Sequence, residues 1–292
     1  MRVTELGRFD LISQRLSNLR SQHQDAAKQA TTGQKINAPS DDPTAAAEAA
    51  RIRAGISQAR SSQRTIDLVK GDVQMAESSL AEAGDVMQRA LEIAMLGGNE
   101  ANGTDQRKSL SIEAGELVSQ LVEIGNTKGS QGYLFSGTAL DQPAFAADGT
   151  FQGNDAEHQV DTGAGTPLAV NVSGARAFTA AGGTDAIASL QALTTALATD
   201  DPAGVRASLG NLQAAHNQIV QERSHAGLII NRIELGENIL TDAHVLLTDQ
   251  DRQNTGVNTD EVYSKLVQLE GAINDSVTVG KRLLDLSSLQ RF

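Results

Sequence analysis

Apolar residues recur at alternating steps of four and three along two proline-free stretches, residues 44–142 and 203–292. Sustained periodicity of 3.5 residues predicts long supercoiled helices that meet along narrow seams. The first row comprises Ala45, Ala49, Ile52, Ile56, Ala59, Gln63, Ile66, Val73, Leu80, Met87 and Ala94, and it continues after Gly97-Gly98 with Leu110, Ala114, Leu117, Leu121 and Ile124. The second row comprises Leu209, Leu212, His216, Ile219, Ala226, Ile230, Ile233, Leu240, His244 and Leu247.

Each long helix is expected to begin at an Asp-Asp-Pro sequence. Asp41-Asp42-Pro43 and Asp200-Asp201-Pro202 each offer an aspartate as N-cap, followed by proline at the first helical position. Proline suits that position because its fixed φ is helical and no amide hydrogen is missed there. We expect a turn and helix start built from Asn37, Pro39, Asp41, Asp42 and Pro43, and two helices that each run on the order of 75 to 80 Å.

Both ends of the chain are amphipathic, and we expect them to form an assembly interface. An isolated helix of about 20 residues is marginal in water unless its apolar face has a partner. The two ends should therefore be mobile in the monomer and should order against each other and against neighbouring subunits. The predicted interface residues are Leu6, Phe9, Ile12, Leu16 and Leu19 at one end, and Leu266, Leu269, Ile273, Leu283 and Leu286 at the other.

The middle of the chain changes character, because residues 139–182 place short alternating apolar patterns among Asp, Gly and Thr. This segment is predicted to be a small strand-and-turn insertion domain. Just before it, Gly132 and Gly137 bracket Tyr133, Leu134 and Phe135. The favoured interpretation is a tight turn whose three apolar side chains anchor it to the helices, and the alternative is a contact between subunits.

The predicted fold class is mainly α: a rod of long antiparallel helices, a coiled coil or bundle, with a small β-containing insertion. The expected parts are an N-terminal helical assembly segment (1–38), the first half of the helical rod (39–138), the insertion (139–182), the second half of the rod (183–256) and a C-terminal helical assembly segment (257–292).

Composition narrows the function. The net charge of −12 disfavours nucleic acid as a partner, since phosphate binding needs clustered Lys and Arg. The chain has no cysteine, so it has neither disulfides nor thiol nucleophiles. Apolar runs that would suit a secretory signal or a membrane span are also absent from the sequence. We therefore expect no membrane insertion, and any export should not use the general secretory route.

No residue pattern in the sequence strongly indicates a metal-binding or catalytic site. The histidines at 23, 158, 216, 225 and 244 lack metal-ligand spacing, and Asp249, Asp251 and Asp260 resemble a calcium loop only faintly, because Asn254 replaces its glycine. Phosphate-binding loops, GxSxG and HExxH do not occur. We therefore expect no enzymatic activity, no cofactor and no metal.

Three motifs then carry a resemblance. These are Lys35-Ile36-Asn37-Ala38-Pro39-Ser40-Asp41-Asp42-Pro43, then Gly97-Gly98 followed by Asn102-Gly103-Thr104, and Gly132-Tyr133-Leu134-Phe135-Ser136-Gly137-Thr138. Together they resemble the hook-associated junction proteins of the bacterial flagellin family over residues 1 to about 140 and about 203 to 292. The ending Gln290-Arg291-Phe292 is more polar than that family's pattern, which weakens the comparison at the C-terminal contact.

The resemblance implies a structural subunit of the extracellular flagellum that adapts the hook to the filament and is needed for filament assembly and motility. It also implies export by the flagellar type III apparatus without a cleavable signal peptide. The implied partners are identical subunits in a ring, a neighbouring hook-associated junction protein, flagellin and an export chaperone. The alternatives are a short flagellin that forms filaments and, outside the family, a cytoplasmic coiled-coil scaffold.

Overall fold

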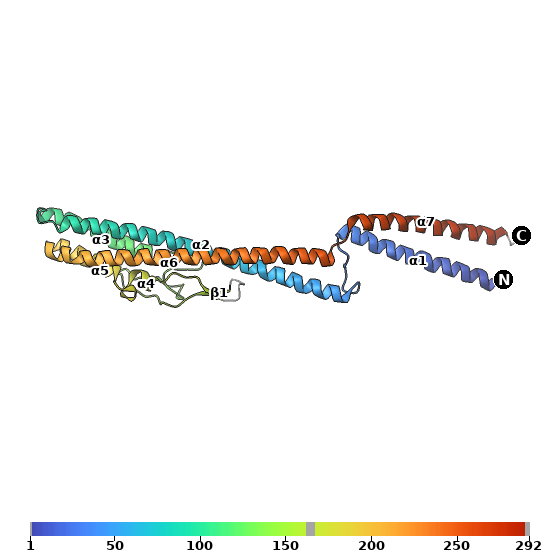
Figure 1. Cartoon of the computed structure of the whole chain (residues 1–292), viewed down its shortest axis with the longest axis horizontal. Helices are drawn as coiled ribbons and strands as arrows, with labels where there is room; N and C mark the ends of the chain where they lie inside the picture. The colour runs from blue at the N-terminus through green and yellow to red at the C-terminus, as the bar shows by residue number, and fades with distance from the viewer. Residues whose placement is uncertain (1, 162–166, 290–292) are drawn as a thin grey trace. The chain divides into compact units, whose positions relative to one another are not determined.

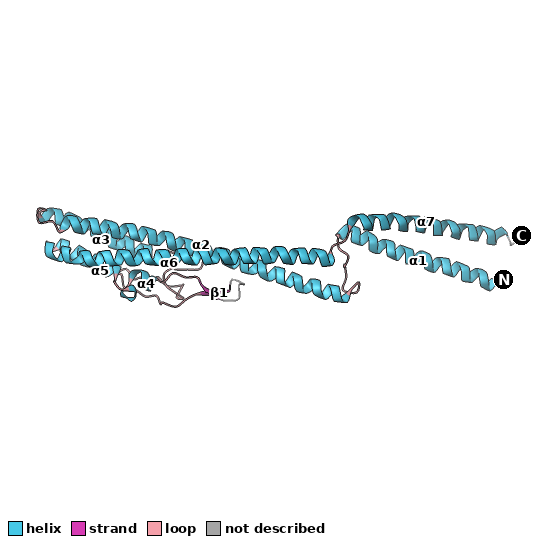
Figure 2. Cartoon of the chain, viewed as in Figure 1, coloured by secondary structure: helices cyan, strands magenta, loops and turns pink. Residues whose placement is uncertain are grey.

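The computed structural model describes residues 2–161 and 167–289, and it is built almost entirely from helices (Figures 1 and 2). In chain order the elements are α1 (Arg2–Thr32), α2 (Pro43–Gly97), α3 (Thr104–Gly125), β1 (Gln159–Asp161), β2 (Pro167–Ala169), α4 (Gly174–Phe178), the 3-10 helix η1 (Ala180–Gly182), α5 (Ala186–Ala198), α6 (Pro202–Thr255) and α7 (Thr259–Leu289). The prediction of a mainly α protein with long antiparallel helices and a small β-containing insertion is confirmed.

The chain divides into two compact units. The first contains residues 1–58 and 244–292, and the second contains residues 59–243. The long helices α2 and α6 each contribute turns to both units. Residues 139–182, predicted as a domain of their own, fall within the second unit and contribute to its hydrophobic core.

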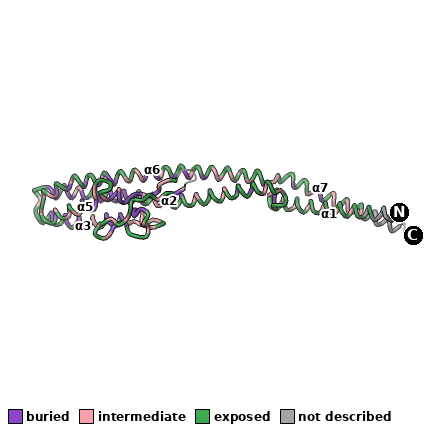
Figure 3. Tube along the Cα trace, turned by 90° about the horizontal axis from the view of Figure 1, so that it is seen from below, coloured by how far each residue is buried: buried purple, intermediate pink, exposed green. Residues whose placement is uncertain are grey.

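In the second unit, ion pairs fix the direction of α2 against α6. Lys70 on α2 contacts Glu237 on α6 at 2.9 Å, and Glu77 contacts Arg223 at 2.6 Å. Residue numbers rise along α2 while those of their partners fall along α6, so the two helices are antiparallel. Helices α3 and α5 pack against each other beside them, and the buried positions of the chain concentrate in this bundle (Figure 3).

The predicted heptad row forms the core of these helices. Leu80 and Met87 on α2 are fully buried, as are Leu212 and Ile219 on α6. Burying a Leu or Met side chain contributes roughly 1.5–3 kcal/mol relative to leaving it exposed. The row therefore holds α2 and α6 together, as the 3.5-residue period predicts.

The insertion contributes a small sheet and an aromatic cluster. Strands β1 and β2 pair antiparallel, with Val160 opposite Leu168. Phe178, at the end of α4, lies edge-to-face against Phe135 and Phe145, with ring centroids 5.4 and 5.6 Å apart. Phe151 lies against Phe145 with ring centroids 5.2 Å apart, so four of the six phenylalanines of the chain meet in one cluster, which anchors the insertion to the helical core.

In the first unit, α1 and α7 lie side by side as an antiparallel pair. The His23 Nε2 atom is 3.5 Å from a Glu270 carboxylate oxygen. Further along the pair, a Cβ placed on Gly280 would lie 3.8 Å from the Ile12 side chain, in ordinary van der Waals contact. The seam is thin, because two helices alone cannot enclose it.

Candidate functional site

Two connecting segments, residues 33–42 and 256–258, join the terminal helices α1 and α7 to the long helices α2 and α6. These two segments, here called the crossovers, are hydrogen-bonded at the point where they leave and enter the terminal helices. The Lys35 amide donates to the Thr255 carbonyl at 2.7 Å, and the Val257 amide donates to the Gly33 carbonyl at 3.2 Å. Between them, Gln34 and Gly256 form an isolated antiparallel bridge. The segment that leaves α1 and the segment that enters α7 are therefore tied to each other by a single bridge and its flanking hydrogen bonds.

The predicted helix-start residues order the next turn. One carboxylate oxygen of Asp41 accepts hydrogen bonds from the amides of Asn37 at 3.0 Å and Ala38 at 2.9 Å. These two amides, that of Ala38 first, lower the pKa of Asp41 below its ordinary value. The Asp42 carboxylate accepts from the amides of residues 44 and 45 and so caps α2, which begins at Pro43.

The described part of the terminal interface lies along the seam between α1 and α7. Leu269 is buried, whereas Ile12, Leu16, Leu19, Leu266 and Ile273 are half-buried. The side chains of Leu6, Phe9, Leu283 and Leu286 lie outside the described residues. Each of the half-buried residues keeps apolar surface that a neighbouring molecule could cover, and the assembly role of all ten residues remains a prediction.

The aromatic turn is anchored at its centre. Phe135 is fully buried, Leu134 packs against the core, and Tyr133 lies under Lys128, whose ammonium is 4.6 Å from the ring centroid. Gly132 and Gly137 have φ angles of 146° and 71°, which side chains rarely tolerate. Phe135 and Leu134 are thus held by the core, and the role of the turn, whether as an anchor or as a contact between subunits at Tyr133, remains a prediction.

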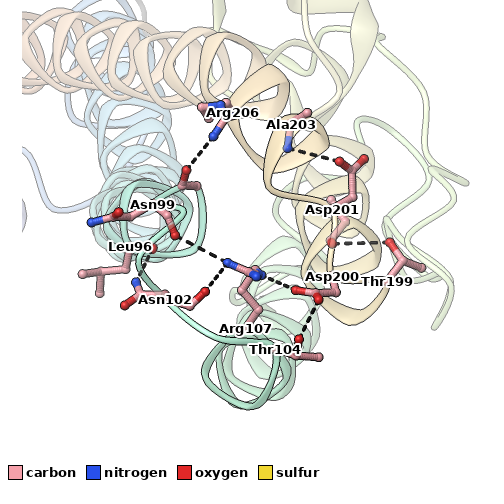
Figure 4. A network of polar contacts seen from close by, with 12 residues as sticks. Leu96, Asn99, Asn102, Thr104, Arg107, Thr199, Asp200, Asp201, Ala203 and Arg206 are labelled. Carbon is pink, nitrogen blue, oxygen red and sulfur yellow. Dashed lines mark hydrogen bonds and ion pairs between the residues drawn. The ribbon is translucent and has the colours of Figure 1, made fainter.

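A polar network that the sequence analysis did not identify joins two loops at the end of α2 (Figure 4). Its centre is the buried Arg107 near the start of α3. Its guanidinium donates to the Asn102 carbonyl at 2.5 Å and to the Asn99 carbonyl at 3.4 Å, and it pairs with the carboxylate of Asp200. Thr104 also donates to that carboxylate, at 2.7 Å.

Asp200 is the one residue other than glycine with positive φ, 55°, in the described part of the chain. The Thr104 hydroxyl and the Arg107 guanidinium lower the pKa of its carboxyl. Both partners favour the charged form, so the network holds the loop between α5 and α6 in its left-handed turn. Asn102-Gly103-Thr104 and Asp200-Asp201-Pro202 are both recognisable motifs in the sequence. No local sequence pattern, however, indicates that these two motifs contact each other.

Two of the three aspartates that faintly resemble a calcium loop, Asp249 and Asp251, form ion pairs with arginines. Asp249 contacts Arg252 at 2.6 Å, and Asp251 contacts Arg53 at 3.2 Å. Among residues 2–161 and 167–289, the structure brings together no group of His, Asp and Glu that could hold a metal ion. Within the same residues, every helix is too short or too polar to cross a membrane.

Comparison with known proteins gives consistent matches. The model of the bacterial flagellin N-terminal helical region matches residues 11–139. Flagellar hook-associated protein 3 of Escherichia coli K12 is 23% identical over 303 aligned residues, which cover 95% of this chain and 94% of that protein. The protein of the same name from Salmonella typhimurium is 27% identical over 184 residues, 61% of this chain and 57% of that protein.

A solved structure shares the fold. The flagellar junction protein FlgL from Legionella pneumophila superposes with a TM-score of 0.56 at 16% identity, over 71% of this chain and 99% of that chain. At this level of identity the likeness establishes the long-helix architecture alone.

Proposed function

Since this chain belongs to the flagellin family, whose members are structural and not enzymatic, we propose that it is the flagellar subunit that joins the hook to the filament. The observation that carries the proposal is the alignment over 95% of the chain with a protein named flagellar hook-associated protein 3. The same alignment covers 94% of that protein, so the two chains correspond over nearly their whole lengths.

The geometry supports a mechanical role. Helices α1 and α7 expose apolar side chains such as Leu11 and Val267 beside a seam of half-buried residues, as a subunit that gains stability on assembly would. The paired crossovers at Lys35 and Thr255 turn the two chain segments together. A subunit of this kind adapts one lattice to another by shape, and without it flagellin subunits would have no platform on the hook.

The proposal extends to the partners and the route. The subunit contacts identical copies in a ring, a preceding hook-associated junction protein and the first flagellins. It is exported unfolded through the flagellar type III apparatus and held beforehand by a chaperone. A chain without cysteine suits that route, because it can unfold and refold without breaking disulfides.

The experiment is deletion of the gene in the source bacterium, followed by electron microscopy of the cells and an assay of flagellin in the medium. Hooks without filaments, flagellin lost to the medium and absence of swimming are the expected results. Normal filaments would overturn the proposal and leave a cytoplasmic coiled-coil scaffold as the remaining hypothesis for the function.

A short flagellin is the second candidate, since the matched family model describes a flagellin helical region. Purified chain separates the two. A flagellin would polymerise by itself into long filaments when salt is added, whereas the junction subunit is expected to stay unpolymerised without a hook end.

A further inference from the structure

The loop between α2 and α3 contains the single Asn-Gly sequence of the chain, Asn102-Gly103. In such a pair the backbone nitrogen of the glycine attacks the asparagine side chain with little hindrance, because glycine has no Cβ. A flexible chain therefore converts this asparagine into aspartate or isoaspartate without an enzyme. Figure 4 shows that the folded loop surrounds the pair with hydrogen bonds.

Three hydrogen bonds fix Asn102 itself. Its backbone amide donates to the Asn99 carbonyl at 3.1 Å, and its side-chain Nδ2 donates to the Leu96 carbonyl at 2.6 Å. Its own carbonyl accepts from the guanidinium of Arg107 at 2.5 Å. The carboxamide of Asn102 thereby satisfies a carbonyl of the last turn of α2, which has no partner within the helix.

Arg107 holds the glycine as well. Its backbone amide donates to the Gly103 carbonyl at 3.2 Å, while its guanidinium holds the carbonyl of Asn102. The Arg107 side chain is buried and is itself fixed by the carboxylate of Asp200. The peptide groups before and after the Gly103 Cα are therefore both held by one buried residue.

We propose that Asn102 is a site of spontaneous deamidation that the folded loop keeps closed and the unfolded chain opens. The Gly103 nitrogen attacks Cγ of Asn102, the bond from Cγ to Nδ2 breaks, and ammonia leaves with the proton of the attacking amide. Solvent water then adds to either carbonyl of the cyclic imide and opens it to aspartate or isoaspartate.

The network slows the first of these steps. To react, the Asn102 carboxamide must leave the Leu96 carbonyl and turn toward the Gly103 nitrogen. The peptide group between the two residues must also turn, and this movement breaks its hydrogen bond with Arg107. In the unfolded chain neither restraint exists, so the reaction there proceeds at the rate of a free Asn-Gly pair.

Either product weakens the loop. A carboxylate at position 102 cannot donate to the Leu96 carbonyl, and it places negative charge at the C-terminal end of α2, where the helix dipole is already negative. Isoaspartate also lengthens the backbone by one carbon and shifts the carbonyl that Arg107 holds. A chain that has reacted therefore refolds with a weakened connection between α2 and α3.

This chemistry limits how long a chain can wait unfolded. A subunit that is held unfolded before export, as proposed above, keeps the Asn102-Gly103 pair open until it folds. Deamidation then reduces the fraction of waiting chains that can rebuild the loop. This consequence rests on the proposed function, whereas the reaction and its suppression depend on folding alone.

The first experiment compares the purified chain in buffer with the same chain in urea, both at mildly alkaline pH. Trypsin then releases a peptide of residues 90–107, which contains Asn99 and Asn102, and tandem mass spectrometry measures the mass gain at each. Asn99 precedes a glutamate and is the internal control. Deamidation of Asn102 should be at least tenfold faster in urea than in buffer, and in urea at least tenfold faster than that of Asn99.

Two outcomes would overturn the inference. Equal rates in buffer and in urea would show that the folded loop does not protect Asn102. A rate in urea no higher than that of Asn99 would show that the pair is not reactive. Neither outcome bears on the junction role, which the deletion experiment tests separately.

Gly103→Ala identifies the attacking nitrogen. Gly103 has a φ of −77°, and a Cβ added there would meet nothing within 4 Å, so alanine fits the folded loop. The variant should give the circular dichroism spectrum of the parent and should deamidate at Asn102 at least tenfold more slowly in urea. A rate equal to that of the parent would exclude the Gly103 nitrogen as the nucleophile.

Arg107→Ala tests the protection in the folded state. Without the guanidinium, deamidation of Asn102 in buffer should rise severalfold, whereas the rate in urea should stay that of the parent. Lys108→Ala, exposed on the same helix, is the matched control. Equal rates in buffer for the two variants, both folded by circular dichroism, would contradict the role of Arg107.

The damage itself is measured with Asn102→Asp, which should unfold at a lower urea concentration than the parent. Asn99→Asp is its matched control, because it adds the same charge near the same helix end but keeps the side-chain oxygen that accepts from the Ala101 amide at 3.0 Å. Equal unfolding midpoints for the two variants would contradict the capping role of the Asn102 carboxamide.

Discussion

The second unit and the terminal pair carry the same heptad spacing, but they bury it to different extents. Leu80 and Ile219 in the second unit are fully buried, whereas Leu16 and Ile273 in the terminal pair are half-buried. In the second unit, α3, α5 and the insertion add core residues to the seam, while in the described part of the terminal pair α1 packs along α7. A heptad therefore specifies which residues face a partner, and the number of covering layers decides how much stability follows.

The largest effect should come from the aromatic cluster of the well-covered region. Phe178→Ala removes a fully buried ring and its two edge-to-face contacts with Phe135 and Phe145. The free energy of unfolding should therefore fall by about 3–5 kcal/mol. Urea unfolding followed by circular dichroism measures it. Ile112→Ala, at a position 67% exposed on α3, should change little, and equal losses in the two variants would contradict the comparison.

Next should come Arg107→Ala. It removes charged hydrogen bonds to the carbonyls of Asn99 and Asn102, and by analogy with similar bonds the free energy of unfolding should fall by about 1.5–3 kcal/mol. Lys108→Ala, exposed on the same helix, is the control. If both variants unfold at the same urea concentration as the parent, the network contributes nothing to stability.

Within the terminal pair, Leu269→Ala should act locally. Leu269 is 7% exposed on a seam of two helices, so a loss near the lower end of the core range, about 2 kcal/mol, is expected for the pair. Limited proteolysis should then cut residues 1–35 and 265–292 faster, with the second unit unchanged. Val267→Ala, 69% exposed on α7, should not speed cleavage.

The unsubstituted chain should show the same difference in stability between the terminal pair and the second unit. Its two ends should already be cut before the second unit in dilute solution, because they lack neighbours. Ends that resist the protease as long as residues 59–243 do would show that the terminal pair is stable by itself, and the two regions would then not differ as proposed.

The smallest effect concerns Asp41. Amides lower its folded pKa below the ordinary value of 3.8, so its contribution to stability is fully present above that value and is lost as pH falls through the folded pKa. The amide resonances of Asn37 and Ala38 should move together in that range in an NMR titration. Asp41→Asn should abolish this transition of the amide resonances, and the control variant Asp275→Asn should retain it. If the transition persists in Asp41→Asn, another titrating group causes it.

Much of the helical architecture was predictable, because its signals are local. Asp42 caps α2 and Pro43 begins it, as the Asp-Asp-Pro sequence indicates, and the heptad positions identified the buried stripe. The parts that escaped prediction depend on residues far apart in the chain. Arg107 and Asp200 are 93 positions apart, and neither has a neighbouring residue that predicts the other.

By itself, then, the sequence determined the two long helices, their starting points at the Asp-Asp-Pro sequences, their heptad positions and the family resemblance, since each depends on spacing within a few turns. Tertiary structure alone decided that the crossovers pair through Lys35 and Thr255, that Phe135 meets Phe178, and that Lys70 of α2 meets Glu237 of α6. The physical reason is that a helical pattern specifies a face but not a register, and register is set by contacts between distant segments.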